Sequence, residues 1–225
     1  MEGKGIPWIP GTANSLGGEA LGLAAGTAGR DVPVDLVEKM ARAFLQAYPN
    51  LFAVNPDDLA LNAQGSGPVL DYLYFIDLNL TRGGVPVEGA HIVFRLNHGN
   101  LVQVGQDLVN PAALKALDPT PTLSAQGAWQ VLWNHIGGQD KKDRIVDAGT
   151  LKIGPVSSST VLERQPAVPG TGLGYRLVYT VSFKRPGIMG TWEARIDAHS
   201  GEMLAFADAN LYGSIKGNAY KTDQV

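Results

Sequence analysis

The first regular pattern along the chain is a helical repeat of apolar residues between positions 35 and 48. The apolar positions are Val37, Met40, Ala41, Phe44, Leu45 and Tyr48, which fall on one face of a helix. Asp35 is a candidate N-cap because Glu38 follows three residues later, as in a capping box. Pro49 is expected to end the helix. The pattern predicts an amphipathic helix that packs one face against a core.

A second helical repeat lies between residues 122 and 138. Its apolar positions are Ala125, Ala128, Trp129, Leu132, Trp133 and Ile136. Thr122 or Ser124 can cap the start of this helix through a hydroxyl oxygen. Gly137-Gly138 can end it, because glycine accepts the left-handed conformation that often follows a helix. This is the second predicted amphipathic helix.

Strand-like runs follow each helix. After the first helix, residues 70–81, 85–96 and 100–108 are rich in apolar and β-branched residues, with Gly83-Gly84 and Asn97-His98-Gly99 as turns. These runs predict an antiparallel meander. After the second helix, the strand candidates are residues 150–156, 160–168, 174–184, 191–198 and 202–210, and His199-Ser200-Gly201 joins the last two.

The order of elements is therefore a helix followed by antiparallel strands, twice. Residues 94–104 and 194–206 weakly echo one another, since each has an apolar strand, a polar turn with His, and a second apolar strand. We expect an α+β fold of two consecutive modules, each an amphipathic helix packed on an antiparallel sheet, as in cystatin. The expected boundaries are an irregular Gly/Ala-rich leader (1–30), a first module (31–115), a second module (120–210) after the prolines at 119 and 121, and a tail (211–225) leading towards a following domain.

Composition and charge narrow the function classes. The chain has 225 residues, a formal net charge of −3 and no Cys. The acidic balance argues against nucleic acid or an anionic membrane as partner, and the lack of Cys removes disulfides and thiol chemistry. No apolar run is long enough to span a bilayer, and residues 1–10 lack the apolar core of a signal peptide. The mixed charge run 140–144 indicates a solvated loop.

The usual catalytic motifs are missing from the sequence. It has no H-E-x-x-H, G-x-S-x-G or phosphate-binding loop, and the four histidines, His91, His98, His135 and His199, show no paired helical spacing for zinc. Asp57-Asp58 and the pair Asp197 and Glu202 are the carboxylates that acid and base catalysis could use, but they are more typical of turns. The Ser/Thr run 157–160 and the glycine-rich segment 170–174 are read as loops. We therefore predict no catalytic, cofactor-binding or metal-binding residues.

One short motif raises a specific choice. His199, Ser200, Gly201 and Glu202 spell H-x-x-E, which is either half of a metal site or a turn between two strands. The runs on both sides, 196–198 and 203–206, are strand-like and need a short glycine-containing turn between them. The turn is the expected structure.

Two stretches resemble the pro-region of thermolysin and fungalysin-like zinc metalloproteases. Gly84-Val85-Pro86-Val87-Glu88-Gly89, with the strand and hairpin after it, resembles the G-V-P-V-x-G element of their propeptide domain. The helix at 123–136, the strand at 175–184 and the ending Ile196 to Leu204 look like a PepSY domain, whose last strands carry a D-A-x-T-G-E element. The likeness covers about residues 32–210 and lacks the family's zinc-binding catalytic domain.

The resemblance implies a propeptide that acts as an intramolecular chaperone and inhibitor of a secreted peptidase. Its partner would be the cognate thermolysin-like catalytic domain, bound in cis or in trans, with the chain itself a non-catalytic monomer, secreted or periplasmic. Recognition would use exposed sheet edges and hairpins. The alternative is a free-standing secreted or periplasmic PepSY-type binding or protease-inhibitor module. A third possibility, an enzyme, requires a metal or deep pocket joining His91, His98, His135 or His199 with carboxylates.

Overall fold

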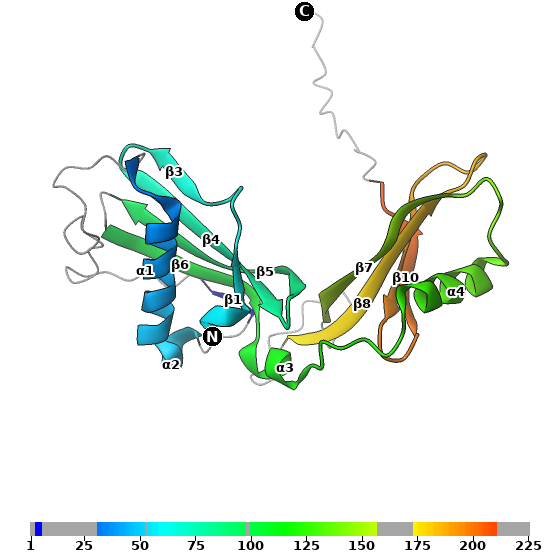
Figure 1. Cartoon of the computed structure of the whole chain (residues 1–225), viewed down its shortest axis with the longest axis horizontal. Coiled ribbons are helices and arrows are strands. Elements are labelled where there is room, and N and C mark those ends of the chain that lie inside the picture. Colours follow the sequence, from blue (N-terminus) through cyan, green and yellow to red (C-terminus); the bar gives the residue numbers. More distant parts are fainter. Residues whose placement is uncertain (1–2, 6–30, 53, 98–99, 157–172, 211–225) are drawn as a thin grey trace, which may run out of the picture.

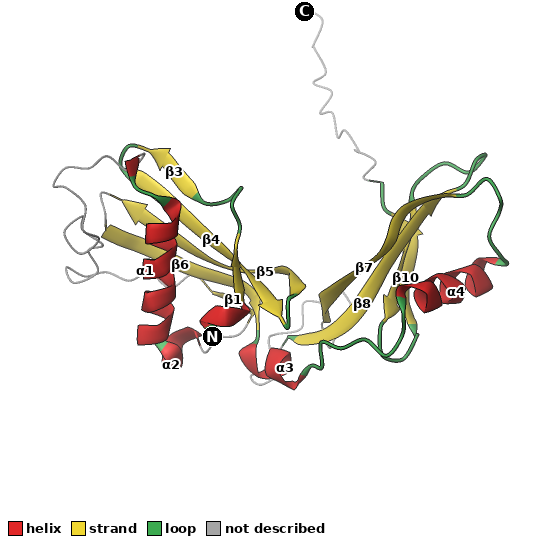
Figure 2. Cartoon of the chain, viewed as in Figure 1, coloured by secondary structure: helices red, strands yellow, loops and turns green. Residues whose placement is uncertain are grey.

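The computed structural model describes residues 3–5, 31–52, 54–97, 100–156 and 173–210, in which short helices lie against a ten-stranded mixed sheet (Figures 1 and 2). The helices are α1 (Val34–Ala47), α2 (Pro49–Phe52), α3 (Pro111–Ala116) and α4 (Ala125–Ile136), with a 3-10 turn, η3 (Pro56–Asp58). The strands are β1 (Gly3–Gly5), β2 (Leu59–Leu61), β3 (Gly67–Leu70), β4 (Leu73–Arg82), β5 (Val85–Asn97), β6 (Asn100–Val109), β7 (Arg144–Val156), β8 (Gly174–Lys184), β9 (Trp192–Asp197) and β10 (Met203–Asp208). The predicted α+β class is confirmed.

Helix α1 confirms the first apolar repeat and its end before Pro49, but its start differs from the prediction. It buries Val37, Ala41 and Leu45. Its N-cap is Pro33, which makes no side-chain cap bond, so the prediction that Asp35 caps the helix is wrong. Extended backbone at Pro33 moves the N-cap two residues earlier and places Asp35 in the first turn. Pro49 follows the end of α1, yet it also opens the four-residue α2, because proline fits the first position of a helix.

Helix α4 follows its prediction closely. The Ser124 side chain accepts a hydrogen bond from the backbone N–H of Gly127 at 3.1 Å, which is the predicted N-cap. Gly137 takes the left-handed conformation at φ 83° and ends the helix. Ala128 and Leu132 are fully buried against the sheet, and Trp133 packs edge-on against Phe183 of β8. The apolar stripe therefore faces the core as expected.

Strands β4, β5 and β6 form the predicted antiparallel meander. The predicted strand 70–81 is in fact two strands, because Leu70 pairs with Leu73 across a two-residue turn. In β7 the strand starts at Arg144, so the charge run forms a turn only over residues 140–143. Strands β7 to β10 then pair antiparallel in chain order.

Several elements lie outside the predictions. Residues 3–5, predicted to be irregular, form β1 against β6, in a strand too short for a periodic pattern to predict. The short α3 was not predicted, although it carries two helix-start signals: Asn110 caps it, and Pro111 occupies its first position. The predicted strand 160–168, the rest of the leader and the tail 211–225 lie outside the described residues.

One strand connects the two predicted modules. β5 pairs with β6 from His91 to Asn97, but at Val87 it pairs in parallel with Ile153 of β7. Both Val87 and Ile153 are buried, and the buried apolar residues of the two halves belong to one cluster. The strands therefore form one sheet, and its pairing does not show two separate modules. The domain boundaries stay a prediction.

Polar contacts reinforce this junction. The Tyr175 hydroxyl of β8 donates to the carbonyl oxygen of Leu108 at 2.6 Å and accepts from the backbone N–H of Asn110 at 2.7 Å. The Asn110 side chain donates to the carbonyl oxygen of Leu173 at 2.7 Å and accepts from Ala113 N–H at the start of α3. Asn110 and Tyr175 are both buried. Because water cannot replace these partners easily, the bonds fix β8 against the end of β6.

A Tyr175→Phe substitution tests this junction. The change deletes one hydroxyl and leaves the buried N–H of Asn110 without its partner, so we expect a loss of about 1–3 kcal/mol in the free energy of unfolding. Urea denaturation followed by circular dichroism measures it. Tyr179→Phe on the same strand is the control, since no hydrogen bond of the Tyr179 hydroxyl is found within the described residues. Equal losses for the two variants would contradict the role of Tyr175.

Candidate functional site

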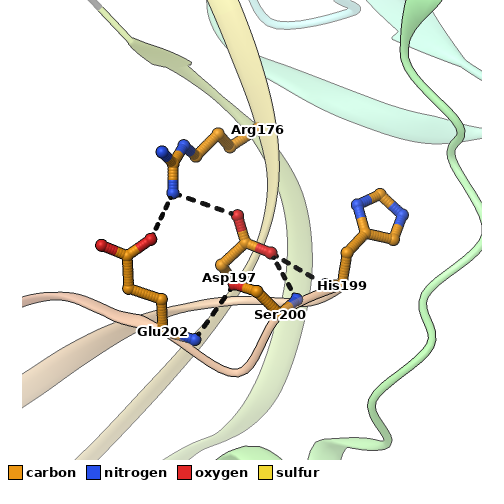
Figure 3. A network of polar contacts seen from close by, with 5 residues as sticks. All are labelled: Arg176, Asp197, His199, Ser200 and Glu202. Carbon is orange, nitrogen blue, oxygen red and sulfur yellow. Dashed lines mark hydrogen bonds and ion pairs between the residues drawn. The ribbon is translucent and has the colours of Figure 1, made fainter.

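Polar side chains gather at the turn between β9 and β10, where the H-x-x-E motif lies (Figure 3). Asp197 ends β9 and is 7% exposed. Its Oδ1 accepts hydrogen bonds from the backbone N–H of His199 at 2.9 Å and of Ser200 at 2.8 Å. The carboxylate therefore supports the backbone of the turn from inside, in the way that aspartate commonly stabilises turns.

The backbone of this turn is closed by two further bonds. Asp197 N–H donates to the carbonyl oxygen of Glu202 at 2.8 Å, and Gly201 N–H donates to the carbonyl oxygen of Asp197 at 2.9 Å. Gly201 has a φ of 75°, which residues with a side chain adopt at a cost. The glycine expected from the sequence is thus required by the hairpin, and the turn between two strands is confirmed.

Arg176 joins the two carboxylates of the motif. Its Nη1 lies 3.4 Å from Asp197 Oδ2 and 2.7 Å from Glu202 Oε2. The Glu202 side chain is 60% exposed, whereas that of Asp197 is 10% exposed. Solvent therefore screens the Arg176–Glu202 pair more than the Arg176–Asp197 pair. The two candidate carboxylates do come together, but both are ion-paired to the same arginine.

The protonation of Asp197 follows from these contacts. Burial raises the pKa of the carboxyl, but the hydrogen bonds from Ser200 and His199 and the charge of Arg176 outweigh burial and leave the pKa below its ordinary value. The Glu202 hydrogen bond and charge raise the pKa of Arg176. Asp197 is therefore ionised at neutral pH and held as a hydrogen-bond acceptor.

The histidines do not come together. His91 is half-buried in β5, opposite Asn79 and Asp107, and His135 is exposed on α4 with its ring 5.6 Å from that of Phe206. His199 directs its ring away from Glu202 (Figure 3), and its Nε2 lies 3.1 Å from the carbonyl oxygen of Thr120. His98 lies outside the described residues. Across the ranges that the structure describes, no three His, Cys, Asp or Glu side chains form a group that could hold a metal ion.

The other candidates also have local roles or lie beyond the described ranges. Asp57 and Asp58 form η3, where Asn55 accepts from Asp57 N–H and Asp58 lies 3.7 Å from Arg82. These contacts are those of a capped turn and a surface ion pair. Residues 157–160 and 170–172 lie outside the described part of the chain. No helix among the described residues is long and apolar enough to cross a membrane.

Two surface features near β7 were missed by the sequence analysis. An open groove of about 520 Å³ runs between α4 and β7, and Trp129 and Trp133 help to line it, although the helical pattern placed both only on the core face. On the side away from β8, Ile153 is the only described residue of β7 with a strand partner, which leaves Ile145 and Val146 exposed at the free edge. Apolar spacing alone does not indicate which side of a strand stays unpaired.

Replacing Asp197 with Asn tests the role of its charge. The variant keeps the shape but weakens bonds to two backbone N–H groups and to Arg176, so we expect a loss of about 1–3 kcal/mol at pH 7. Because the folded-state pKa is lowered, the stabilisation is fully present above the unfolded pKa of about 3.9 and is lost as the pH falls through the folded-state pKa.

Urea unfolding of wild type and variant between pH 7 and pH 2 checks this prediction. The two stability curves should converge at the acid end. Glu202→Gln is the control and should change stability little, because Glu202 is exposed. A gap between wild type and Asp197→Asn that does not depend on pH would contradict the electrostatic explanation.

Comparisons with known proteins give distant likenesses to solved structures alone. No protein-family model matches the chain, and no curated protein matches it. Among solved structures, the Bacillus megaterium YpeB C-terminal domain aligns with 80% of this chain at a TM-score of 0.30 and 12% sequence identity. The aligned part spans 66% of that domain's own chain. A likeness at this level establishes neither a shared family nor a shared function.

Proposed function

We propose that this protein is a secreted or periplasmic, non-catalytic binding module of the PepSY type, which binds and inhibits a thermolysin-like metalloprotease. The D-A-x-S-G-E resemblance supports the assignment, and it falls on the hairpin that Asp197 holds together. Helix α4 with strands β7 to β10 forms the helix-on-sheet unit that the resemblance implies. The chain's contribution is a shaped surface, without a catalytic group of its own.

The observation that carries the proposal is the cluster of positive side chains at the start of β7. Arg144 pairs with Lys184 of β8 in register, so two positive residues face one another across neighbouring strands. Like charges in this position lower the stability of a strand pair. Lys141 and Lys142 lie in the adjoining turn, and no ion pair of any of these four side chains is found within the described residues. Asp140 and Asp143 lie in the same turn, but Asp143 is paired with Arg185, so positive side chains still predominate here in a chain of net charge −3.

The same place offers apolar surface and free backbone. Ile145 and Val146 are 40% and 53% exposed. Further along, the backbone is occupied, since Asp147 Oδ1 accepts from Gly149 and Thr150 N–H and Trp129 Nε1 donates to Ala148. Residues 144–146 are thus the open part of the edge. An extended segment of the partner with acidic residues next to an apolar residue would complement it in charge and in hydrogen bonding.

A specific observation favours a second candidate, the pro-region of such a protease. The G-V-P-V-E-G element of the resemblance begins in the turn at Gly83-Gly84 and ends at Gly89 within β5, and these three glycines have positive φ values of 56°, 81° and 70°. Glycine adopts such φ values at little cost, so the backbone conformation accounts for glycine at these positions. In this candidate α1 with β4 to β6 is a propeptide module, and a covalent tether would raise the effective concentration to about the millimolar range.

An Arg144→Glu substitution tests the binding surface. It places opposite charges across β7 and β8, so folding is expected to be preserved. We expect the wild-type chain to slow peptide hydrolysis by its cognate thermolysin-like catalytic domain, and the variant's inhibition constant to rise about tenfold or more, which corresponds to about 1.4 kcal/mol. Steady-state hydrolysis at low salt measures it.

Lys39→Glu on α1 is the matched control, because it makes the same change in net charge at an exposed position far along the chain. Its inhibition constant should equal that of the wild type. Absence of inhibition by the wild-type chain would sink the proposed function, and equal effects of the two variants would remove β7 as the surface. Renaturation of the unfolded catalytic domain distinguishes the candidates, since only a pro-region should increase the recovered activity.

A further inference from the structure

The groove between α4 and β7 has a lining unlike that of the core beneath it. Its volume of about 520 Å³ is in the range of small-molecule sites, about 300–1,000 Å³. Two indoles, three carboxamides and one aliphatic side chain account for most of the lining, from Trp129, Trp133, Gln126, Gln130, Gln139 and Ile145. None of these side chains carries a charge. The groove is separate from the polar network at Asp197.

The indoles form a fixed platform. Trp129 and Trp133 are four residues apart on α4 and stack with ring centroids 4.8 Å apart and an angle of 26° between their planes. Trp129 Nε1 donates to the carbonyl oxygen of Ala148 at 3.0 Å, and Trp133 packs edge-on against Phe183. Each ring is therefore held by a strand of the sheet as well as by its own helix. A ligand would meet an aromatic surface that is already in place.

The carboxamides supply polar capacity around this platform. Gln130 Nε2 donates to Asn134 Oδ1 at 2.8 Å, while the Gln126 and Gln139 side chains are exposed and make no hydrogen bond to other described residues. A carboxamide offers two N–H donors and an oxygen with two acceptor lone pairs. The groove thus combines an apolar surface with donors and acceptors in similar number, without a formal charge.

We propose that this groove binds a sugar unit of a neutral oligosaccharide. A pyranose ring has C–H faces that can pack on an indole of the groove. The hydroxyl groups at its rim both donate and accept hydrogen bonds, as the carboxamides of the groove do. A phosphate or carboxylate ligand would find no cation in this lining, and anions are normally bound by arginine, lysine or helix N-termini. A fatty chain would use the indoles but none of the donors and acceptors of the carboxamides. The groove shares Ile145 with the edge at residues 144–146, but the inference rests on the indoles and carboxamides and not on protease binding.

Nuclear magnetic resonance of the full chain tests the proposal. The probes are cellotetraose, maltotetraose and N,N′,N″,N‴-tetraacetylchitotetraose, each titrated to millimolar concentration. We expect at least one of them to shift the indole Nε1–H resonance of Trp129, which the bond to Ala148 holds in place. The resonance of Trp192, on β9 and outside the groove lining, should stay unchanged.

In the double variant Gln126→Ala/Gln139→Ala, the Kd for the oligosaccharide should rise at least tenfold. Both side chains are exposed, so circular dichroism should show the wild-type fold. The control is Gln46→Ala, an exposed glutamine near the end of α1. No shift with any of the three sugars would overturn the proposal. It would also be overturned if a neutral extended peptide shifted the Trp129 resonance and the sugars did not. The same holds if the double variant bound the oligosaccharide as tightly as the Gln46→Ala control and the wild type.

Discussion

The hydroxyl of Tyr175 is the contact on which the arrangement of the molecule depends. This one hydroxyl binds both the carbonyl oxygen of Leu108 and the backbone N–H of Asn110. These two groups flank Val109, where β6 ends and the chain continues into α3. Leu108 itself has a φ of 50°, the one positive value among the described residues other than glycine. The strain of that backbone is tolerated because its surroundings fix it on several sides. Here the surroundings include a tyrosine from a strand far along the chain.

Two groups of charges near the second half of the sheet have different physical character. Around Asp197 the charged side chains meet an opposite charge or a backbone N–H, and these contacts hold the hairpin together. At the start of β7 the positive side chains face one another, which lowers stability in the isolated chain. Paired charges of the first kind stabilise the fold, whereas unpaired charges of the second kind are open to a binding partner. Asp197 and Glu202, which were the candidate catalytic carboxylates in the sequence, therefore have a structural role.

Local patterns predict most of the elements, because amphipathic spacing and turn residues act over a few positions. The face of α4, its Ser124 cap and its Gly137 end all follow from neighbouring residues. Pairing between strands that are not consecutive has no such local sign, so the parallel contact of Val87 with Ile153 could not be predicted. The same limit applies to the site: spacing shows that Trp129 and Trp133 share a face with the core, but only packing shows that a groove stays open beside them.

The position of β5 in the sheet has a consequence for synthesis of the chain. Strands β4, β5 and β6 are consecutive, so this meander can form while the later residues are still being made. The stretch of β5 around Val87 must then wait for β7, with an apolar residue and open backbone groups at an edge. Such an edge pairs readily with another nascent chain. Glu88, which forms an ion pair with Arg195 of β9 in the finished fold, places a charge at that edge during the interval and opposes premature association.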